Sequence, residues 1–148
     1  GHLQHPNGGV NQIMTLVTPP EGSYPLAEFF GIEPVHDQDR MGCRITINEN
    51  HLNPHGVVHG GVLFTMVDQA MGMAAYQHLA PNQICTTLEI HIRYLKPVSE
   101  GVIEVLTTML NQGRRIVQLE AKATAGGRVV GAATGSFVVL TLPETPAP

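Results

Sequence analysis

The sequence contains few charged residues, few cysteines and no long apolar run. Only 14% of its 148 residues are Asp, Glu, Lys or Arg, whereas soluble domains carry roughly 25%. Disordered chains are rich in charge and poor in apolar residues, so the 43% apolar share excludes disorder. With 8 Lys and Arg against 12 Asp and Glu, the net charge is −4, which offers no strong basic field for a general nucleic-acid binder. The low charge favours a surface that other subunits partly cover.

The two cysteines, Cys43 and Cys85, each lie in an apolar alternating segment, which favours two buried free thiols over a disulfide. No apolar run reaches 18 residues, so we expect no transmembrane helix and no membrane partner. The start, Gly1-His2-Leu3, resembles the remnant of a cleaved tag and is left out of the fold prediction. Because no signal peptide is visible, the cytoplasm is the expected location.

The length predicts a single domain with a real core. Residues 1–23 are rich in Gly, Pro, Asn and Gln, and we expect a flexible segment there. The folded domain is expected over residues 24–142, followed by a disordered tail over residues 143–148.

The apolar pattern predicts two helices and a series of strands. The expected helices cover Pro25–Gly31 and Val62 to about Ala80, and the expected strands cover Met41–Asn48, Ile84–Leu95, Val102–Leu110, Arg115–Ala125 and Val129–Leu142. The connections between the last four strands are short, so we expect antiparallel neighbours.

The second helix is unusual because apolar residues occupy all of its faces. Between Gly61 and Ala80 it carries one acid, Asp68, and neither Lys nor Arg. A helix that is apolar all round must be buried all round, and only the sheet is available to cover it. We therefore predict an α+β fold in which a long central helix is wrapped by a curved antiparallel sheet of about five to six strands.

Asp68 is a candidate for chemistry. None of the residues three or four positions away is basic, and no Lys or Arg occurs between Arg44 and Arg93. A buried carboxylate without a partner is costly, and such a group is a candidate general base or nucleophile. The alternative is an aspartate whose oxygens bind backbone amides or a distant arginine.

The loop before the helix offers a complementary group. Its end, His59-Gly60-Gly61, lies at the expected helix N-terminus, where unpaired N–H groups and the helix dipole favour an oxyanion or a polarised carbonyl. A plain helix-start turn is the alternative. Gly60 and Asp68 are eight residues apart, which is about 12 Å along one helix. If the two groups cooperate, they must come from two chains, so the sequence predicts an active site shared at a dimer interface.

These motifs resemble those of the hotdog-fold acyl-CoA thioesterases. The resemblance rests on His59–Asp68 (HGGVLFTMVD), on Asn53 before it, and on Thr86–Glu89 (TTLE) and Arg93–Pro97 (RYLKP) after it. It extends over about residues 26–142 and is greatest for the phenylacetate-degradation (PaaI-like) and 4-hydroxybenzoyl-CoA type. It implies the hotdog fold, hydrolysis of an acyl-CoA thioester without a cofactor, and a homodimer as the minimal unit, with a homotetramer built as a dimer of dimers.

The resemblance also implies catalytic roles. The Gly60 N–H would bind the thioester carbonyl, with His59 beside it, and Asp68 of the facing subunit would activate a water or attack directly. Asn53 would orient the water or the carbonyl, and Thr87 would help to hold the water. Strict strand alternation, however, places Thr87 on the face away from the helix and Thr86 toward it, unless a bulge re-aims one of them.

An acidic chain that binds the polyanion CoA must gather positive charge locally. Residues 93–128 hold six basic and three acidic side chains, a local charge of +3, whereas residues 1–92 hold two basic and eight acidic ones, a local charge of −6. Arg93, Lys96, Arg114 and Arg115 are therefore candidate contacts for the CoA phosphates, with solvated strand and turn residues as the alternative. The candidate acyl pocket comprises Leu63, Phe64, Val67 and Met71. The sequence does not decide between an aryl and a medium-chain acyl group as the substrate.

The sequence gives less support to three other functions. His51, His55 and His59 lie four apart, as zinc ligands on a helix would, but Pro54 and Gly56 between them disfavour a helix, and we expect no metal. A hydratase or dehydratase acting on acyl thioesters would need a His paired with an acid in a motif that is not found. A non-catalytic acyl-CoA-binding module is disfavoured by Asp68 in the central helix.

Overall fold

The computed structural model describes residues 24–143. The predicted flexible segment over 1–23 and residues 144–148 of the predicted tail lie outside the described residues. The described chain folds in the order α2 (Pro25–Phe30), β1 (Glu33–Asp37), β2 (Arg40–Thr46), a 3-10 turn η1 (Glu49–His51), α3 (Gly60–Tyr76), β3 (Gln83–Tyr94), β4 (Val102–Gln112), β5 (Ile116–Ala125) and β6 (Arg128–Thr141).

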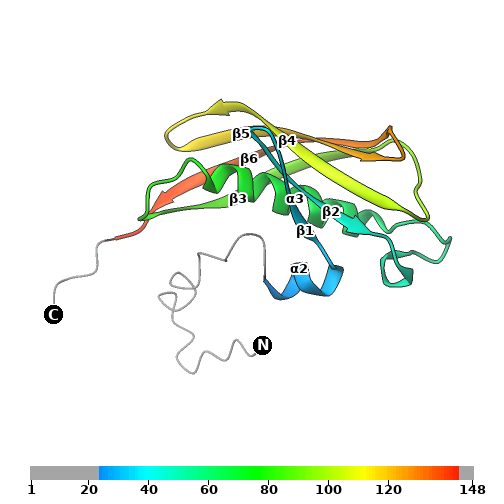
Figure 1. Ribbon diagram of the computed structural model, residues 1–148. Helices are drawn as coiled ribbons and strands as arrows, with labels where there is room; N and C mark the ends of the chain where they lie inside the picture. Colours follow the sequence, from blue (N-terminus) through cyan, green and yellow to red (C-terminus); the bar gives the residue numbers. More distant parts are fainter. Residues whose placement is uncertain (1–23, 144–148) are drawn as a thin grey trace, which may run out of the picture.

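One curved antiparallel sheet of six strands, in the order β1-β2-β4-β5-β6-β3, curls over the long helix α3 (Figure 1). The predicted fold class is therefore confirmed. The strand β1 was not predicted, because its sequence EPVHD shows no apolar alternation. Since β1 lies at the edge of the sheet, its Pro34 is tolerated there.

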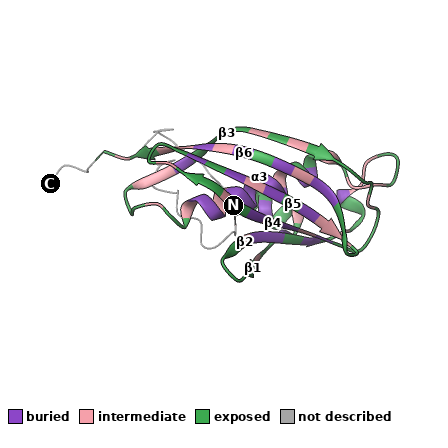
Figure 2. Ribbon diagram, turned by 90° about the horizontal axis from the view of Figure 1, so that it is seen from above, coloured by how far each residue is buried: buried purple, intermediate pink, exposed green. Residues whose placement is uncertain are grey.

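The core lies between α3 and the sheet. Figure 2 shows the buried residues running along the inner strands and one side of α3, with β3 mostly exposed or half-buried at its edge. Met66 and Met71 on α3 are fully buried, and each such side chain contributes roughly 1.5–3 kcal/mol through burial. They pack in one cluster with Ile45, Val105 and Leu119 from the strands. Packing against the sheet therefore holds α3 in place.

In the single chain, α3 is not buried on all sides. Gly61 and Phe64 are exposed and Thr65 and Asp68 half-buried, and together they form a stripe along the helix that the sheet does not cover. The prediction of an all-round buried helix is corrected on this point, because the sheet curls around only part of it. Within the described residues, neither helix combines the length and the apolar character needed to cross a bilayer.

Cys43 and Cys85 are both free and buried, as expected from the sequence. The Cys43 thiol donates to the Met66 carbonyl at 3.3 Å, which links β2 to α3. Burial raises the pKa of Cys43 to about 12. Burial, and then the charge of Asp68, raise the pKa of Cys85 to about 11.

These raised pKa values predict a loss of stability in alkali. The folded chain holds the thiol protons more tightly than the unfolded chain, in which thiols ionise near pH 9, so the free energy of unfolding falls as the pH rises from 9 toward 11. We expect the two thiols together to lower it by about 3 kcal/mol between pH 8 and pH 10. Urea unfolding at both pH values, with Cys43→Ala/Cys85→Ala as the control, measures their share. An equal decline in both proteins would contradict the assignment.

Candidate active site

Asp68 lies near the middle of α3, on the stripe that the sheet leaves open. The Thr87 hydroxyl donates to its Oδ1 at 2.6 Å, so the expectation of a carboxylate without a partner is corrected. In the described part of the chain, Oδ2 accepts no hydrogen bond. One carboxylate oxygen is thus fixed while the other stays available to a water or a substrate.

A bulge in β3 turns Thr87 toward α3. The pairing of β3 with β6 shifts register between Thr87 and Glu89, which makes Leu88 the extra residue. Cys85 before the bulge and Ile90 after it both pack into the core, although strict alternation would place them on opposite faces. Thr87 therefore shares the helix-facing side with both of them, which resolves the parity conflict seen in the sequence.

The surroundings of Asp68 are only partly apolar. The Tyr24 hydroxyl donates to the side-chain oxygen of Gln69 at 2.9 Å. Burial first, and the charge of Asp68 second, raise the pKa of Tyr24, as they also do for the Cys85 thiol. The negative charge of Asp68 is thus felt by both of these groups.

At the N-terminus of α3, the Gly60 N–H has no hydrogen-bond partner among the described residues. His59 caps the helix, since its Nδ1 accepts from the Gly61 N–H at 2.8 Å and its carbonyl accepts from the Val62 N–H at 2.9 Å. The N–H groups of Gly61 and Val62 are thus both bound to His59. The Gly60 N–H stays available at the positive end of the helix dipole.

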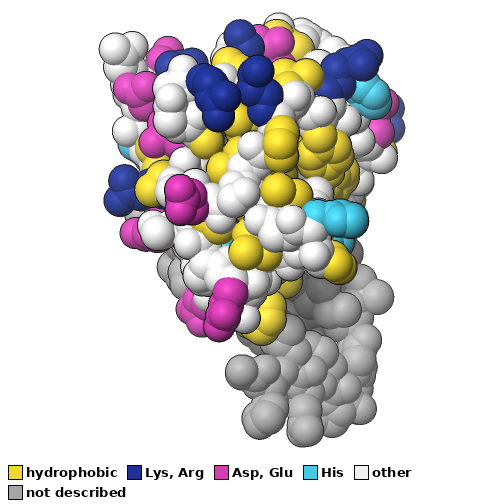
Figure 3. Space-filling view, turned by 90° about the vertical axis from the view of Figure 1, so that its right-hand side faces the viewer, with side chains coloured by type: hydrophobic (Ala, Val, Ile, Leu, Met, Phe, Trp, Pro, Cys, Tyr) yellow, Lys and Arg dark blue, Asp and Glu magenta, His cyan; other side chains and the backbone are white. Residues whose placement is uncertain are grey.

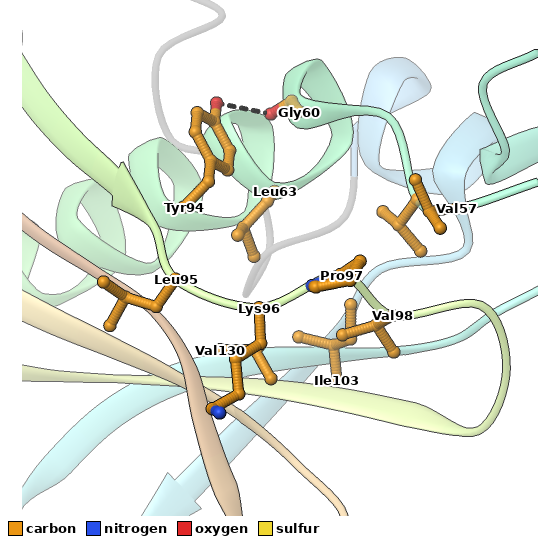
Figure 4. Close-up of a pocket in the computed structure, with 11 residues that line it drawn as sticks. Val57, Gly60, Leu63, Tyr94, Leu95, Lys96, Pro97, Val98, Ile103 and Val130 are labelled. Atoms are coloured by element: carbon orange, nitrogen blue, oxygen red, sulfur yellow. Dashed lines mark hydrogen bonds between the residues drawn. The ribbon is translucent and has the colours of Figure 1, made fainter. Parts of the chain in front are cut away.

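Tyr94, at the end of β3, packs directly on Gly60. Its hydroxyl donates to the Gly60 carbonyl at 2.8 Å, and a Cβ on Gly60 would lie only 3.0 Å from the Tyr94 ring. Figure 4 shows the ring beside the start of α3 with this hydrogen bond drawn. Tyr94 therefore fixes the first peptide of the helix and explains why residue 60 lacks a side chain.

Asn53 organises the loop before the helix. Its Oδ1 accepts from the backbone N–H groups of His55 at 2.9 Å and Val57 at 3.3 Å, and its own N–H donates to the Val57 carbonyl at 2.8 Å. These bonds close a tight turn that leads the chain back to α3. The side-chain oxygen is thus engaged in the turn, and the side-chain NH₂ is the part left for a ligand.

His51, His55 and His59, whose spacing resembles that of zinc ligands, lie in different surroundings. His51 is buried, with Nδ1 accepting from the Asn48 N–H at 3.0 Å and Nε2 at 2.7 Å from the Phe30 carbonyl. His55 is exposed, and His59 caps α3. No group of three potential metal ligands occurs in the stretch that the structure describes.

An apolar cavity of about 420 Å³ opens beside Gly60, between the start of α3 and the connection from β3 to β4 (Figure 4). Its lining comprises Val57, Val58, Gly60, Leu63, Tyr94, Leu95, Lys96, Pro97, Val98, Ile103 and Val130. Figure 3 views this end of the molecule, where apolar surface lies open and Lys and Arg side chains gather along its upper edge. A cavity of this size and character suits an apolar group held next to the Gly60 N–H.

The family model of the thioesterase superfamily matches residues 55–132, from the loop before α3 into β6. The chain belongs to the thioesterase superfamily. It is therefore a thioester hydrolase.

Two similar proteins are named as an esterase and as a CoA hydrolase. A protein of Saccharolobus solfataricus named "Putative esterase" is 33% identical over 116 residues, which are 77% of this thioesterase and 77% of that protein. The 1,4-dihydroxy-2-naphthoyl-CoA hydrolase of Listeria monocytogenes is 26% identical over 100 residues, which are 67% of this thioesterase and 81% of that enzyme.

Solved structures are similar over most of their length. A Bacillus halodurans protein in a crystal structure with CoA matches with a TM-score of 0.77 and 32% identity, over 82% of each chain. A mutant of the phenylacetic acid degradation protein PaaI from Thermus thermophilus matches with a TM-score of 0.71 and 23% identity, over 78% of this thioesterase and 98% of that chain. The family and the hotdog fold expected from the motifs are thus confirmed.

The remaining predicted residues are spread over several parts of the molecule. Of the acyl-pocket candidates, Leu63 lines the apolar cavity, Phe64 lies on the open stripe of α3, and Val67 and Met71 are buried in the core. Of the basic candidates, Lys96 lines the same cavity and Arg93 lies exposed on β3. Arg114 and Arg115 lie at the other end of this thioesterase, at the turn between β4 and β5.

Two features of the site were not predicted. The contact between Tyr94 and Gly60 joins residues 34 positions apart, and the only signal in the sequence is a hydroxyl at the end of an apolar alternating strand. The grouping of Arg114 and Arg115 around a separate cavity depends on which ends of the strands meet. Neither follows from local pattern.

Proposed function

We propose that this thioesterase hydrolyses acyl-CoA thioesters at a site that two copies of the chain complete together. The observation that carries the proposal is the spacing of two groups on α3, the unpaired Gly60 N–H and the Asp68 carboxylate. Eight helical residues separate them by about 12 Å, too far for both to reach one thioester carbon. A second copy whose α3 runs antiparallel brings its Gly60 to the Asp68 of the first.

Two surface features support such a pairing. Among the strands of residues 24–143, β3 pairs with β6 alone, so no described strand occupies its other edge. Phe64, midway between Gly60 and Asp68, is 38% exposed on the stripe that the sheet leaves uncovered. A two-fold axis near Phe64 would bury this ring and form two equivalent sites, which is also the arrangement that the low charge content favours. A homotetramer built from two such dimers stays part of this proposal.

The chemistry follows from the donors and acceptors at hand. The thioester carbonyl accepts a hydrogen bond from the Gly60 N–H, which stabilises the negative charge that develops on the oxygen. Asp68, held by Thr87, takes a proton from a water that attacks the carbonyl carbon, or its free oxygen attacks that carbon directly. The tetrahedral intermediate then expels the CoA thiolate, which takes the proton held by Asp68; after direct attack, a water hydrolyses the mixed anhydride formed on Asp68 and releases the acid.

The neighbouring residues complete the arrangement. The acyl group enters the apolar cavity beside Gly60, and the Asn53 NH₂ orients the water or the carbonyl. The CoA part of the substrate is supported by the relatives, since one similar enzyme is named as a CoA hydrolase and one similar structure contains CoA. The rival hydratase chemistry lacks its acid-base pair, because no His within the described chain forms an ion pair with an acid.

Replacing the Asp68 carboxylate by an amide tests its role as general base or nucleophile. We expect Asp68→Asn to lower kcat by roughly 100- to 10,000-fold, because the amide can neither accept a proton from water nor attack the carbon. Glu89→Gln, an exposed acid-to-amide change just past the bulge, is the matched control and should keep the wild-type kcat. Release of free thiol from an acyl-CoA panel measures both. Near-wild-type turnover by Asp68→Asn would rule out this mechanism.

Removing the Gly60 N–H tests the carbonyl site. Proline suits the first position of a helix, and the dihedral angles of His59, −62° and 136°, suit a residue that precedes proline. We expect Gly60→Pro to lower kcat by roughly 100- to 1,000-fold, as the loss of an oxyanion donor does. Gly60→Ala brings the same Cβ against Tyr94 but keeps the N–H, so it should lose less. Equal kcat values for the two variants would contradict a role for the N–H.

A further inference from the structure

The two edge strands of the sheet differ in how well they resist pairing with another chain. β1, at one edge, has five residues and includes Pro34, and both features discourage a further strand. β3, at the other edge (Figure 2), has twelve residues and no proline, and among the described strands it pairs with β6 alone. A long edge strand without such protection is a surface on which another strand can pair.

The outer face of β3 carries a short run of polar side chains. Ile90 and Ile92 pack against the core, so they point toward α3. The three residues that alternate with them, Glu89, His91 and Arg93, are exposed and lie on the face away from α3. This run begins directly after the bulge at Leu88 and ends one residue before the end of the strand.

The two charges of this run find no opposite charge on the neighbouring strand. β6 places Ser136 opposite Glu89 and Ala132 opposite Arg93. In the part of the chain that the structure describes, neither Glu89 nor Arg93 forms an ion pair. An opposite charge can therefore reach them from the side of β3 that no described strand covers.

The order of the three polar side chains is complementary to itself. Glu89 lies two residues before His91, and Arg93 lies two residues after it. When two copies of β3 run antiparallel with His91 opposite itself, each Glu89 lies opposite an Arg93 on the same face. A shift of one residue would set the outer face of one strand against the inner face of the other, and a shift of two residues would separate both charge pairs.

Contacts between β3 and α3 point to the same centre. At one end, the Tyr94 hydroxyl donates to the Gly60 carbonyl at 2.8 Å. At the other end, the Thr87 hydroxyl donates to Asp68 at 2.6 Å. A two-fold axis that brings Gly60 of one copy to Asp68 of the other therefore also exchanges the places of the two hydroxyl-bearing residues.

Such an axis crosses β3 midway between Thr87 and Tyr94. Because Leu88 is the extra residue of the bulge, the positions of this interval that pair with β6 are 87 and 89–94, seven in all. His91 is the fourth of these seven positions. The charge pattern and the catalytic contacts thus give the same centre independently of each other.

We propose that β3 pairs antiparallel with β3 of a second copy in the register that places His91 on the two-fold axis, with Glu89 opposite the partner's Arg93 at two symmetric positions. The inference rests on the proposed function for the axis through α3, whereas the charge pattern supports the register without it. On the inner face, the half-buried Ile90 then lies opposite the partner's Ile92 and extends the core across the axis.

The register matters because it sets the distance between the two halves of each shared site. A slip of two residues would move the partner by about 7 Å along β3. That displacement is more than twice the length of a hydrogen bond, so the partner's Gly60 N–H would no longer serve a thioester held at Asp68. The ion pairs on the outer face therefore select the one alignment in which the site is complete.

Reversing and then exchanging the charges tests the pairing. Arg93→Glu sets a carboxylate against the partner's Glu89 at both positions, and we expect it to raise the dimer Kd by roughly 10- to 100-fold at low salt. The exchange Glu89→Arg/Arg93→Glu restores both ion pairs and should return the Kd to within about threefold of the wild-type value. Sedimentation equilibrium measures each Kd. An exchanged variant as weakly dimeric as Arg93→Glu would overturn the pairing.

Two further variants separate this effect from a general change of charge. Lys122→Glu makes the same change of charge on an exposed residue of β5 and should leave the dimer Kd unchanged. Glu89→Gln introduces no like charge, and its amide oxygen can still accept from the partner's Arg93, so this variant stays dimeric and keeps its kcat. A rise in Kd for Lys122→Glu equal to that for Arg93→Glu would contradict a specific ion pair.

Engineered disulfides locate the axis. His91→Cys sets two thiols directly opposite each other with Cα atoms about 5 Å apart, which a disulfide spans. Under oxidised glutathione we expect a covalent dimer of this variant, and none of the wild type, whose Cys43 and Cys85 are buried. Glu89→Cys and Arg93→Cys should each fail alone, because their own copies lie about 14 Å away, and should cross-link when the two variants are mixed.

The outcomes distinguish the register from the proposed function. Covalent dimers of Glu89→Cys alone or of Arg93→Cys alone, without those of His91→Cys, would overturn the register. If the wild type hydrolyses acyl-CoA at a shared site in that case, the proposed function stands. Cross-linking of His91→Cys and restoration by the charge exchange, in a chain that hydrolyses no acyl-CoA, would overturn the function and keep the register.

Discussion

The rigidity of α3 governs the rest of the molecule, because it holds the Gly60 N–H and the Asp68 carboxylate about 12 Å apart. A helix cannot shorten to bring its own base to its own N-terminal donor. In the proposed function, a single chain therefore carries two halves of different sites. The proposed second copy would pack on the open stripe of α3 and beside the edge of β3 that no described strand covers.

Hydrogen bonds from neighbouring residues fix the orientation of the groups in each proposed half-site. At the helix start, His59 binds the Gly61 N–H and Tyr94 binds the Gly60 carbonyl, so the Gly60 N–H keeps its direction while no described residue pairs with it. At mid-helix, the Thr87 hydroxyl fixes one oxygen of Asp68. Preorganised groups of this kind need little rearrangement as charge develops in the transition state. The sheet supports both halves, since β3 carries Thr87 and Tyr94 on its helix-facing side.

Most of the fold could be predicted from local pattern, and most of the site could not. The apolar helix and the alternating strands identify α3 and the five longer strands, because burial imposes these periods on the sequence. β1 could not be predicted, because an edge strand needs no apolar alternation. Thr87 was chosen through the family motif, yet only the bulge at Leu88 explains how it reaches Asp68. The separation of Lys96 from Arg114 depends on strand connections, which composition does not encode.

Mixing two inactive variants tests the shared site most directly. Asp68→Asn and Gly60→Pro chains, unfolded together in equal amounts and refolded, form mixed dimers in which one site combines an intact Gly60 with an intact Asp68. We expect recovery of about a quarter of the wild-type thioesterase activity, because half of the dimers are mixed and each carries one intact site of two. Activity no greater than that of the two variants refolded separately would contradict a site built from two chains.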